Sequence, residues 1–129
     1  MNLLDRVRTL VERTNQPTPV ERNLRERFRF LVEEQGFELA RSDALHNGAM
    51  AAYKNVPARR AVMVLARRGK GVWAGIGALD EAGRMAALDR HAIEQGRWRP
   101  LGTVNLGAGV DSLDEAIERL AETLRSKRA

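Results

Sequence analysis

The amino-acid sequence predicts an α+β fold: two N-terminal helices, a mostly antiparallel sheet of three to five strands, and a C-terminal helix. Apolar residues follow helical spacing up to Gly36, alternate with a period of two after it, and return to helical spacing from Leu113. Segregated helices and strands are typical of an α+β fold rather than a parallel α/β fold. The loops between the strands are too short for helical crossovers, so we expect antiparallel pairing, with the helices mainly on one face.

The first helix is predicted over residues 3–13, where five apolar side chains form one stripe. Pro17 ends this helix, because the residue before a proline disfavours the helical conformation. The prolines at 17 and 19 could hinge residues 1–14 at Asn15–Pro19. This helix is therefore a candidate for docking on a partner.

The second helix has the clearest start signal in the chain. Thr18 is a preferred N-cap residue, Pro19 suits the first helical position, and Glu21 follows three residues after the cap. An apolar stripe then continues for several turns and gives the helix an inner face. We expect the helix to end near Gly36, because glycine readily adopts the left-handed conformation at a helix C-terminus.

The first two strands are predicted on either side of a loop over residues 43–48. Residues 37–41 alternate apolar and polar side chains, which indicates a half-buried strand. The loop ends in Asn47-Gly48, a strong turn dipeptide. Residues 49–54 form a second, weaker strand, which Pro57 and its neighbours end.

Residues 61–66 are predicted to form the central strand, because they are apolar without interruption. Such a short run indicates a strand covered on both faces. A hairpin loop over residues 68–71 leads into the next strand, over residues 72–79. On that strand two glycines share a face with Trp73, which indicates a close backbone approach or a bulge.

The final third of the chain carries an ambiguous segment, a short strand and a helix. The thin apolar stripe of residues 80–96 could line a helix, and residues 98–106 predict a short edge strand. The last helix is marked by Ser112 as its cap and by Glu115 three residues later. Its acidic first turn and basic last turn both complement the helix dipole.

Length and composition fit a single α+β domain over residues 1–129, with 43% apolar and 30% charged residues. The chain lacks cysteine, so disulfides, cysteine-based zinc sites and thiol nucleophiles are excluded. Charges interrupt the N-terminus before an apolar run develops, and no run is long enough to span a membrane. We therefore expect a cytoplasmic protein without a membrane partner.

The basic charge balance favours an acidic partner such as nucleic acid. The formal net charge is +5 and the sequence pI is about 10.6. However, 19 of the 22 basic residues are arginine, beside abundant alanine. A GC-rich genome produces this bias without selection for phosphate contacts, so the charge alone is a modest argument.

Catalytic signals are weak. The chain has two histidines: His46 follows Asp43 by three residues, and His91 follows Asp89 by two. Neither spacing places an imidazole and a carboxylate on one helical face. No glycine-rich segment matches a phosphate-binding motif, and no spacing indicates metal ligands. We therefore expect no catalytic residues, no metal and no cofactor.

Basic and aromatic residues gather in short stretches at the predicted strand ends. Arginines interleaved with tryptophans can follow a nucleic-acid backbone and stack bases, and both residue types are enriched at protein interface hot spots. The alternative is that the tryptophans fill the core and the arginines are solvated strand ends. The candidate binding residues are Arg59, Arg60, Arg67, Arg68, Lys70, Trp73, Arg97, Trp98 and Arg99.

The sequence favours a small, non-catalytic, macromolecule-binding module whose partner is a protein, such as an adaptor, an immunity-like or a chaperone-like protein. The general shape resembles many small bacterial α+β proteins that bind another macromolecule, a likeness that implies no residue roles. One alternative is a nucleic-acid-binding domain that uses a basic hairpin patch. A less favoured one is a small enzyme that uses His46 or His91 with a nearby carboxylate. A homo-oligomer, in which the partner is a second copy of the chain, is a further alternative.

Overall fold

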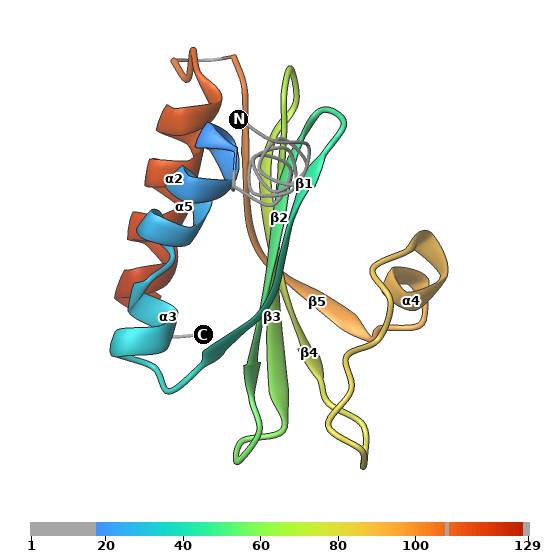
Figure 1. Ribbon diagram of the computed structural model, residues 1–129. Helices are drawn as coiled ribbons and strands as arrows, with labels where there is room; N and C mark the ends of the chain where they lie inside the picture. The colour runs from blue at the N-terminus through green and yellow to red at the C-terminus, as the bar shows by residue number, and fades with distance from the viewer. Residues whose placement is uncertain (1–17, 108, 128–129) are drawn as a thin grey trace, which may run out of the picture.

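A five-stranded antiparallel sheet forms the centre of the fold (Figure 1). The computed structural model describes residues 18–107 and 109–127. Each strand pairs with the next one along the chain, so β3 is central and β1 and β5 are the edges. The strands are β1 (Glu38–Leu45), β2 (Gly48–Asn55), β3 (Arg60–Arg67), β4 (Gly71–Ala78) and β5 (Trp98–Asn105). The predicted α+β fold with an antiparallel sheet is confirmed.

The helices lie mainly on one face of the sheet, as predicted. Figure 1 shows α2, α3 and α5 on one side of the strands and the short α4 on the other. Their bounds are α2 (Pro19–Arg27), α3 (Phe30–Glu33), α4 (Arg90–Glu94) and α5 (Leu113–Lys127). The helix predicted over residues 3–13, and its hinge, lie outside the described residues.

The helix predicted from Thr18 begins as expected but is divided into two. The Thr18 hydroxyl accepts a hydrogen bond from the Glu21 N–H at 3.2 Å, and proline occupies the first helical position. The Phe28 N–H still donates to the Leu24 carbonyl at 3.1 Å, but the Arg29 N–H donates to the Glu26 carbonyl, only three residues back, and α3 begins at Phe30. Phe28 and Phe30 are both buried, with ring centroids 5.8 Å apart, so packing holds the chain together across the break.

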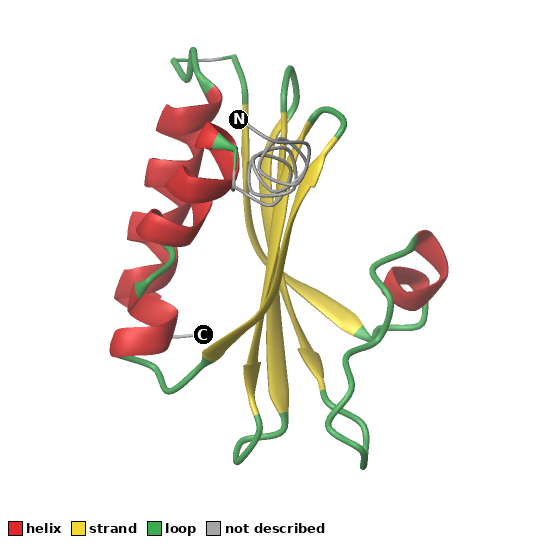
Figure 2. Cartoon of the chain, viewed as in Figure 1, coloured by secondary structure: helices red, strands yellow, loops and turns green. Residues whose placement is uncertain are grey.

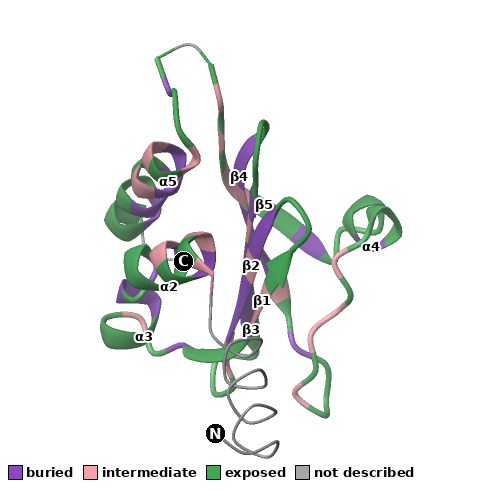
Figure 3. Ribbon diagram, turned by 45° about the horizontal axis from the view of Figure 1, so that its top comes forward, coloured by how far each residue is buried: buried purple, intermediate pink, exposed green. Residues whose placement is uncertain are grey.

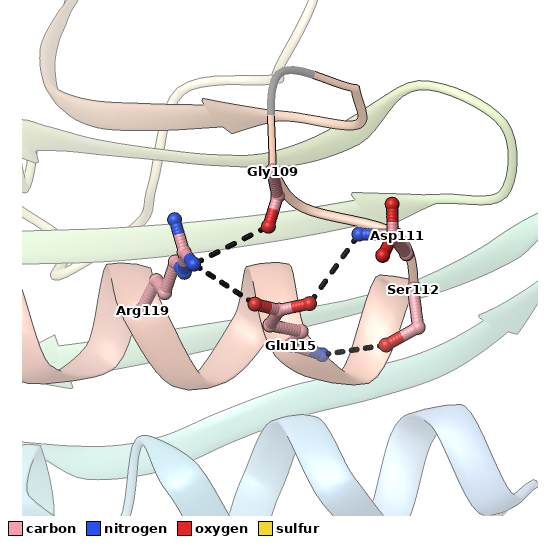
Figure 4. A network of polar contacts seen from close by, with 5 residues as sticks. All are labelled: Gly109, Asp111, Ser112, Glu115 and Arg119. Atoms are coloured by element: carbon pink, nitrogen blue, oxygen red, sulfur yellow. Dashed lines mark hydrogen bonds and ion pairs between the residues drawn. The ribbon is translucent and has the colours of Figure 1, made fainter.

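The start of α5 has the predicted Ser112 cap, but the Glu115 carboxylate bonds the residue before the cap (Figure 4). The Ser112 hydroxyl accepts the Glu115 N–H at 3.1 Å, and the Glu115 carboxylate accepts the Asp111 N–H at 3.3 Å. Arg119, one turn further on, donates to the same carboxylate at 2.9 Å and to the Gly109 carbonyl at 3.3 Å. These contacts tie the first turn of α5 to the segment that leads into it.

The main core fills the space between the helices and the first face of the sheet. Figure 3 shows buried residues both on the helices and on the strands that face them. Alternate residues of β2, β3 and β4 point toward the helices, as the period of a strand requires. The largest fully buried side chains of this core are Tyr53, Phe28, Leu24, Leu31, Ile117, Leu120, Leu124, Val62, Val64 and Val72. Burying each large apolar side chain contributes about 1.5–3 kcal/mol.

A smaller core lies on the second face of the sheet, under the chain between β4 and β5. Trp98 is only 2% exposed, packs with Leu79, Met63 and Ala92, and donates its indole N–H to the Ala87 carbonyl at 3.1 Å. Figure 2 shows that loop makes up most of this connection. The ambiguous segment 80–96 therefore contains only one short helix, α4.

One strand prediction needs correction. Residues 43–48 are not a loop: β1 continues to Leu45 and β2 starts at Gly48, leaving only a two-residue turn. Pairing between the two strands satisfies the backbone hydrogen bonds there, and this outweighs the polar local composition. The edge strand predicted over residues 98–106 is confirmed as β5.

Gly48 supplies the first test of the fold, because the β2–β3 pair leaves no room for a side chain there. A Cβ atom at Gly48 would lie 1.9 Å from the Ala66 carbonyl oxygen. We expect Gly48→Ala to lower the free energy of unfolding in urea by about 3 kcal/mol. Gly69→Ala is the control: its Cβ would meet nothing within 4 Å, so only its positive φ costs about 1 kcal/mol. Equal losses for the two variants would contradict this packing.

Tyr53 supplies the second test, because its buried hydroxyl has no hydrogen-bond partner among the described residues. Burial raises the pKa of Tyr53 from its ordinary value of 10.0 to about 12, and the nearby Arg25 opposes the shift. The folded protein therefore holds this proton more tightly than the unfolded chain. The stability so contributed is complete below pH 10 and is lost as the pH rises toward 12.

Tyr53 is the only tyrosine, so its ionisation can be followed by absorbance near 295 nm. We expect a titration midpoint near pH 12 in the native protein and near 10 in concentrated urea. Tyr53→Phe should remove the signal, and should leave stability unchanged or improved because an unpaired polar group is removed. A native midpoint equal to that in urea would show that the hydroxyl is not buried.

Candidate functional site

The structure divides the predicted binding residues between the two ends of the sheet. Arg60 begins β3 and Arg67 ends it, which at about 3.3 Å per residue places them roughly 23 Å apart. Arg68 and Lys70 belong to the β3–β4 turn beside Arg67, at the same end. The candidate residues therefore form two separate basic surfaces rather than one patch.

The end away from that turn is hollowed into what we call the arginine cleft, of about 420 Å³. It is lined by Ala58, Arg59, Arg60, Ile76, Gly77, Ala78, Gly96, Arg97 and Arg99. Four of the predicted binding residues thus come together from the β2–β3 turn, the start of β3, the segment before β5, and β5 itself. No carboxylate is among the residues that line this cleft.

The two tryptophans have different positions. Trp98 is buried in the second core, so the core interpretation is correct for it and its ring is not accessible for stacking. Trp73 is half-buried on the second face of β4, where its ring lies over Gly75. A Cβ at Gly75 would lie 2.2 Å from that ring. The close backbone approach predicted for this strand occurs at Gly77, where a Cβ would lie 2.6 Å from the Arg97 carbonyl oxygen.

A second surface, which sequence reasoning missed, is an apolar groove on the second face of the sheet. Two adjoining hollows of about 550 and 580 Å³ share Leu65 and Leu88 and together form this open-face groove. Its apolar lining includes Leu45, Met50, Met63, Leu65, Trp73, Met85, Leu88 and Ile93. The one sequence signal for it was the uninterrupted apolar run of residues 61–66, which required a cover on both faces.

The groove exists because the chain covers the second face only in part. In the first hollow residues 84–88 share the lining with β1, β2 and β3, and in the second hollow residues 88–94 share it with β3, β4 and β5. Large apolar side chains at its two ends stay in solvent: Leu45 is 37% exposed and Ile93 is 42% exposed. These exposed side chains leave both ends of the groove accessible to an apolar partner.

The rim of the groove carries unneutralised positive charge. Asp43 pairs with Arg41, and Glu94 pairs with Arg90 at 3.0 Å. Asp89 caps α4, where its carboxylate accepts the Ala92 N–H at 2.7 Å. The rim cations without a side-chain partner among the described residues are Lys54, Arg67 and Arg84.

Neither histidine lies in these two surfaces. His46 occupies the β1–β2 turn and His91 lies in α4, and both are exposed. Within residues 18–107 and 109–127, neither imidazole joins a salt bridge or a side-chain hydrogen bond. The same residues contain no cluster of three or more histidine or acidic side chains that could hold a metal ion.

None of the helices in the described part of the chain combines the length and apolar character needed to cross a bilayer.

The chain was also compared with known proteins. The scan against family models and the searches of curated proteins and of solved structures find no match to this chain. The two surfaces are therefore interpreted from their own geometry and charge.

Proposed function

We propose that the protein is a non-catalytic binding module that holds a short apolar segment of a partner protein in the open-face groove. The observation that carries this proposal is the groove itself, which is apolar, open to solvent and lined both by the sheet and by the connection from β4 to β5. Each of its hollows has the size of an ordinary ligand site. A segment with two or more apolar side chains would fill both hollows and cover Leu65 and Leu88 between them.

The methionines of the chain favour an occupant that is a flexible peptide. Three of the four, Met50, Met63 and Met85, line the same hollow. Methionine side chains are unbranched and polarisable, so they adapt to apolar partners of different shape. Surfaces rich in methionine are used where a protein accepts several related segments, which is consistent with an adaptor or a chaperone-like protein.

The charges of the rim favour a segment that also carries acidic residues. The carboxylates at the rim already have partners, whereas Lys54, Arg67 and Arg84 do not have one among the described residues. Aspartate or glutamate on either side of the apolar side chains would meet these cations. Rim charges of this kind mainly raise the association rate and select the partner, while the apolar contacts supply most of the affinity.

Selection from a random peptide display library tests this proposal even though the partner is unidentified. We expect enriched peptides to combine apolar residues with flanking aspartate or glutamate. With the ε-methyl groups of methionine labelled for NMR, such a peptide should shift the signals of Met50, Met63 and Met85. Selection of basic peptides, or of peptides that leave these methyl signals unchanged, would contradict the proposal.

Matched variants locate the binding surface. Leu65→Asp places a charge where the two hollows meet, and Ile93→Asp places one on an exposed residue of the groove. We expect each to weaken peptide binding by about tenfold or more, since a buried charge without a partner opposes apolar contact. Val56→Asp is the control, because Val56 is 57% exposed and lies outside the groove. Melting curves establish that each variant is folded.

A further inference from the structure

We propose that the arginine cleft binds the phosphate groups of an anionic ligand. The cleft is separate from the open-face groove, so this proposal does not depend on the proposed function. The four arginines reach the cleft from segments up to 40 residues apart in sequence, from Arg59 to Arg99. The shape of the cleft, its charge and the absence of carboxylates from its lining all favour an anion.

The sheet register places Ile76, Gly77 and Ala78 of β4 between two arginine-bearing strands. Arg60 on β3 is paired with Ala78 on β4, and Arg99 on β5 is paired with Ile76. Because neighbouring strands lie about 4.8 Å apart, β3 and β5 are separated by roughly 10 Å across β4. Gly77 and Ala78 have little or no side chain, which leaves the end of β4 hollow beside Arg60.

Backbone hydrogen bonds hold the other two arginines at the mouth of the cleft. Arg59 has a φ of +54°, the left-handed conformation that residues other than glycine rarely adopt. Its carbonyl accepts the Leu79 N–H at 2.9 Å, which ties this turn to the end of β4. The Arg97 N–H donates to the Ala92 carbonyl at 2.9 Å. The two turns that carry Arg59 and Arg97 are therefore anchored to the body of the protein.

The charge of the cleft differs from that of several arginines elsewhere. Some arginines on or beside the helices lie within 4 Å of a carboxylate, as Arg29 does with Glu33 and Arg125 with Glu34. None of the four cleft arginines has such a pair among the described residues. The acidic residue that lines an adjoining hollow, Asp80, uses its carboxylate for two backbone N–H groups.

Four unneutralised guanidinium groups around a concave surface focus a positive potential on it. An anion placed between them would relieve their mutual repulsion. Guanidinium groups hold phosphate oxygens through paired, charge-assisted hydrogen bonds, which makes phosphate the anion that best fits this lining.

The lining of the cleft offers no aromatic surface for a base to stack on. Trp98, which lies between Arg97 and Arg99 in sequence, is 2% exposed and packs on the opposite face of the sheet. Binding would therefore depend on phosphate oxygens and not on base identity. A small diphosphate and the backbone of a nucleic-acid strand share this chemistry, and an experiment can separate them.

The full chain should be titrated at low salt with inorganic pyrophosphate by calorimetry and with a labelled single-stranded oligonucleotide of mixed sequence by anisotropy. We expect Arg60→Gln with Arg99→Gln to weaken binding by about tenfold or more. The control is Arg68→Gln with Lys70→Gln, which removes the same charge in the β3–β4 turn at the opposite end of the sheet and should change binding by less than about threefold. Circular dichroism and melting curves confirm that both double variants are folded.

Each outcome decides the proposal. Cleft-dependent binding of pyrophosphate alone identifies a small phosphorylated ligand. Cleft-dependent binding of the oligonucleotide, with an affinity that falls steeply with salt, identifies a nucleic-acid strand. If neither probe binds the native protein, or if the two double variants lose binding equally, the cleft has no special role and the proposal is wrong.

Discussion

The burial of β3 on both faces is the constraint on which the rest of the structure depends. Val62, Val64 and Ala66 point toward the helices, while Ala61 and Met63 point to the other side, and all five are buried. A strand of this kind is stable only if both faces of the sheet are covered. The helices cover the first face. The connection from β4 to β5 covers the second face only in part, and the open-face groove is the part that stays uncovered.

Trp98 determines how far that second cover extends. Its ring fills the space beside Gly77, and its indole N–H is satisfied by the Ala87 carbonyl, so the connection is held close to β4 and β5. Further toward β1 the same connection contributes only a wall, which includes Met85 and Leu88. Because Trp98 packs in the second core, it does not contribute to the basic surface formed by its sequence neighbours Arg97 and Arg99. The pleat of β5 places Trp98 on one face and Arg99 on the other.

The sequence was sufficient for the order and type of most elements because their signals are local. Two helix starts are marked by the caps Thr18 and Ser112, which bond residues three positions away. The central strand is marked by the uninterrupted apolar run of residues 61–66. The β1–β2 turn was missed because its polar residues resemble a loop, whereas pairing between Ala44 and Ala49 extends both strands through them. The extra hydrogen bonds come from a neighbouring strand, and no local pattern records them.

The four cleft arginines were among the binding residues predicted from the sequence, but which basic residues lie together could not be predicted. Arg67, Arg68 and Lys70 are close together in sequence and resemble a basic patch, whereas the arginine cleft needs β3, β4 and β5 side by side. The groove likewise needs Leu45, Leu65 and Ile93 to be brought together by the meander. Since the cleft opens at one end of the helix-covered face and the groove lies on the opposite face, their occupants would not collide. A single copy of the chain could therefore hold an anionic ligand and a protein segment together, and both β3 and β4 contribute residues to the two sites.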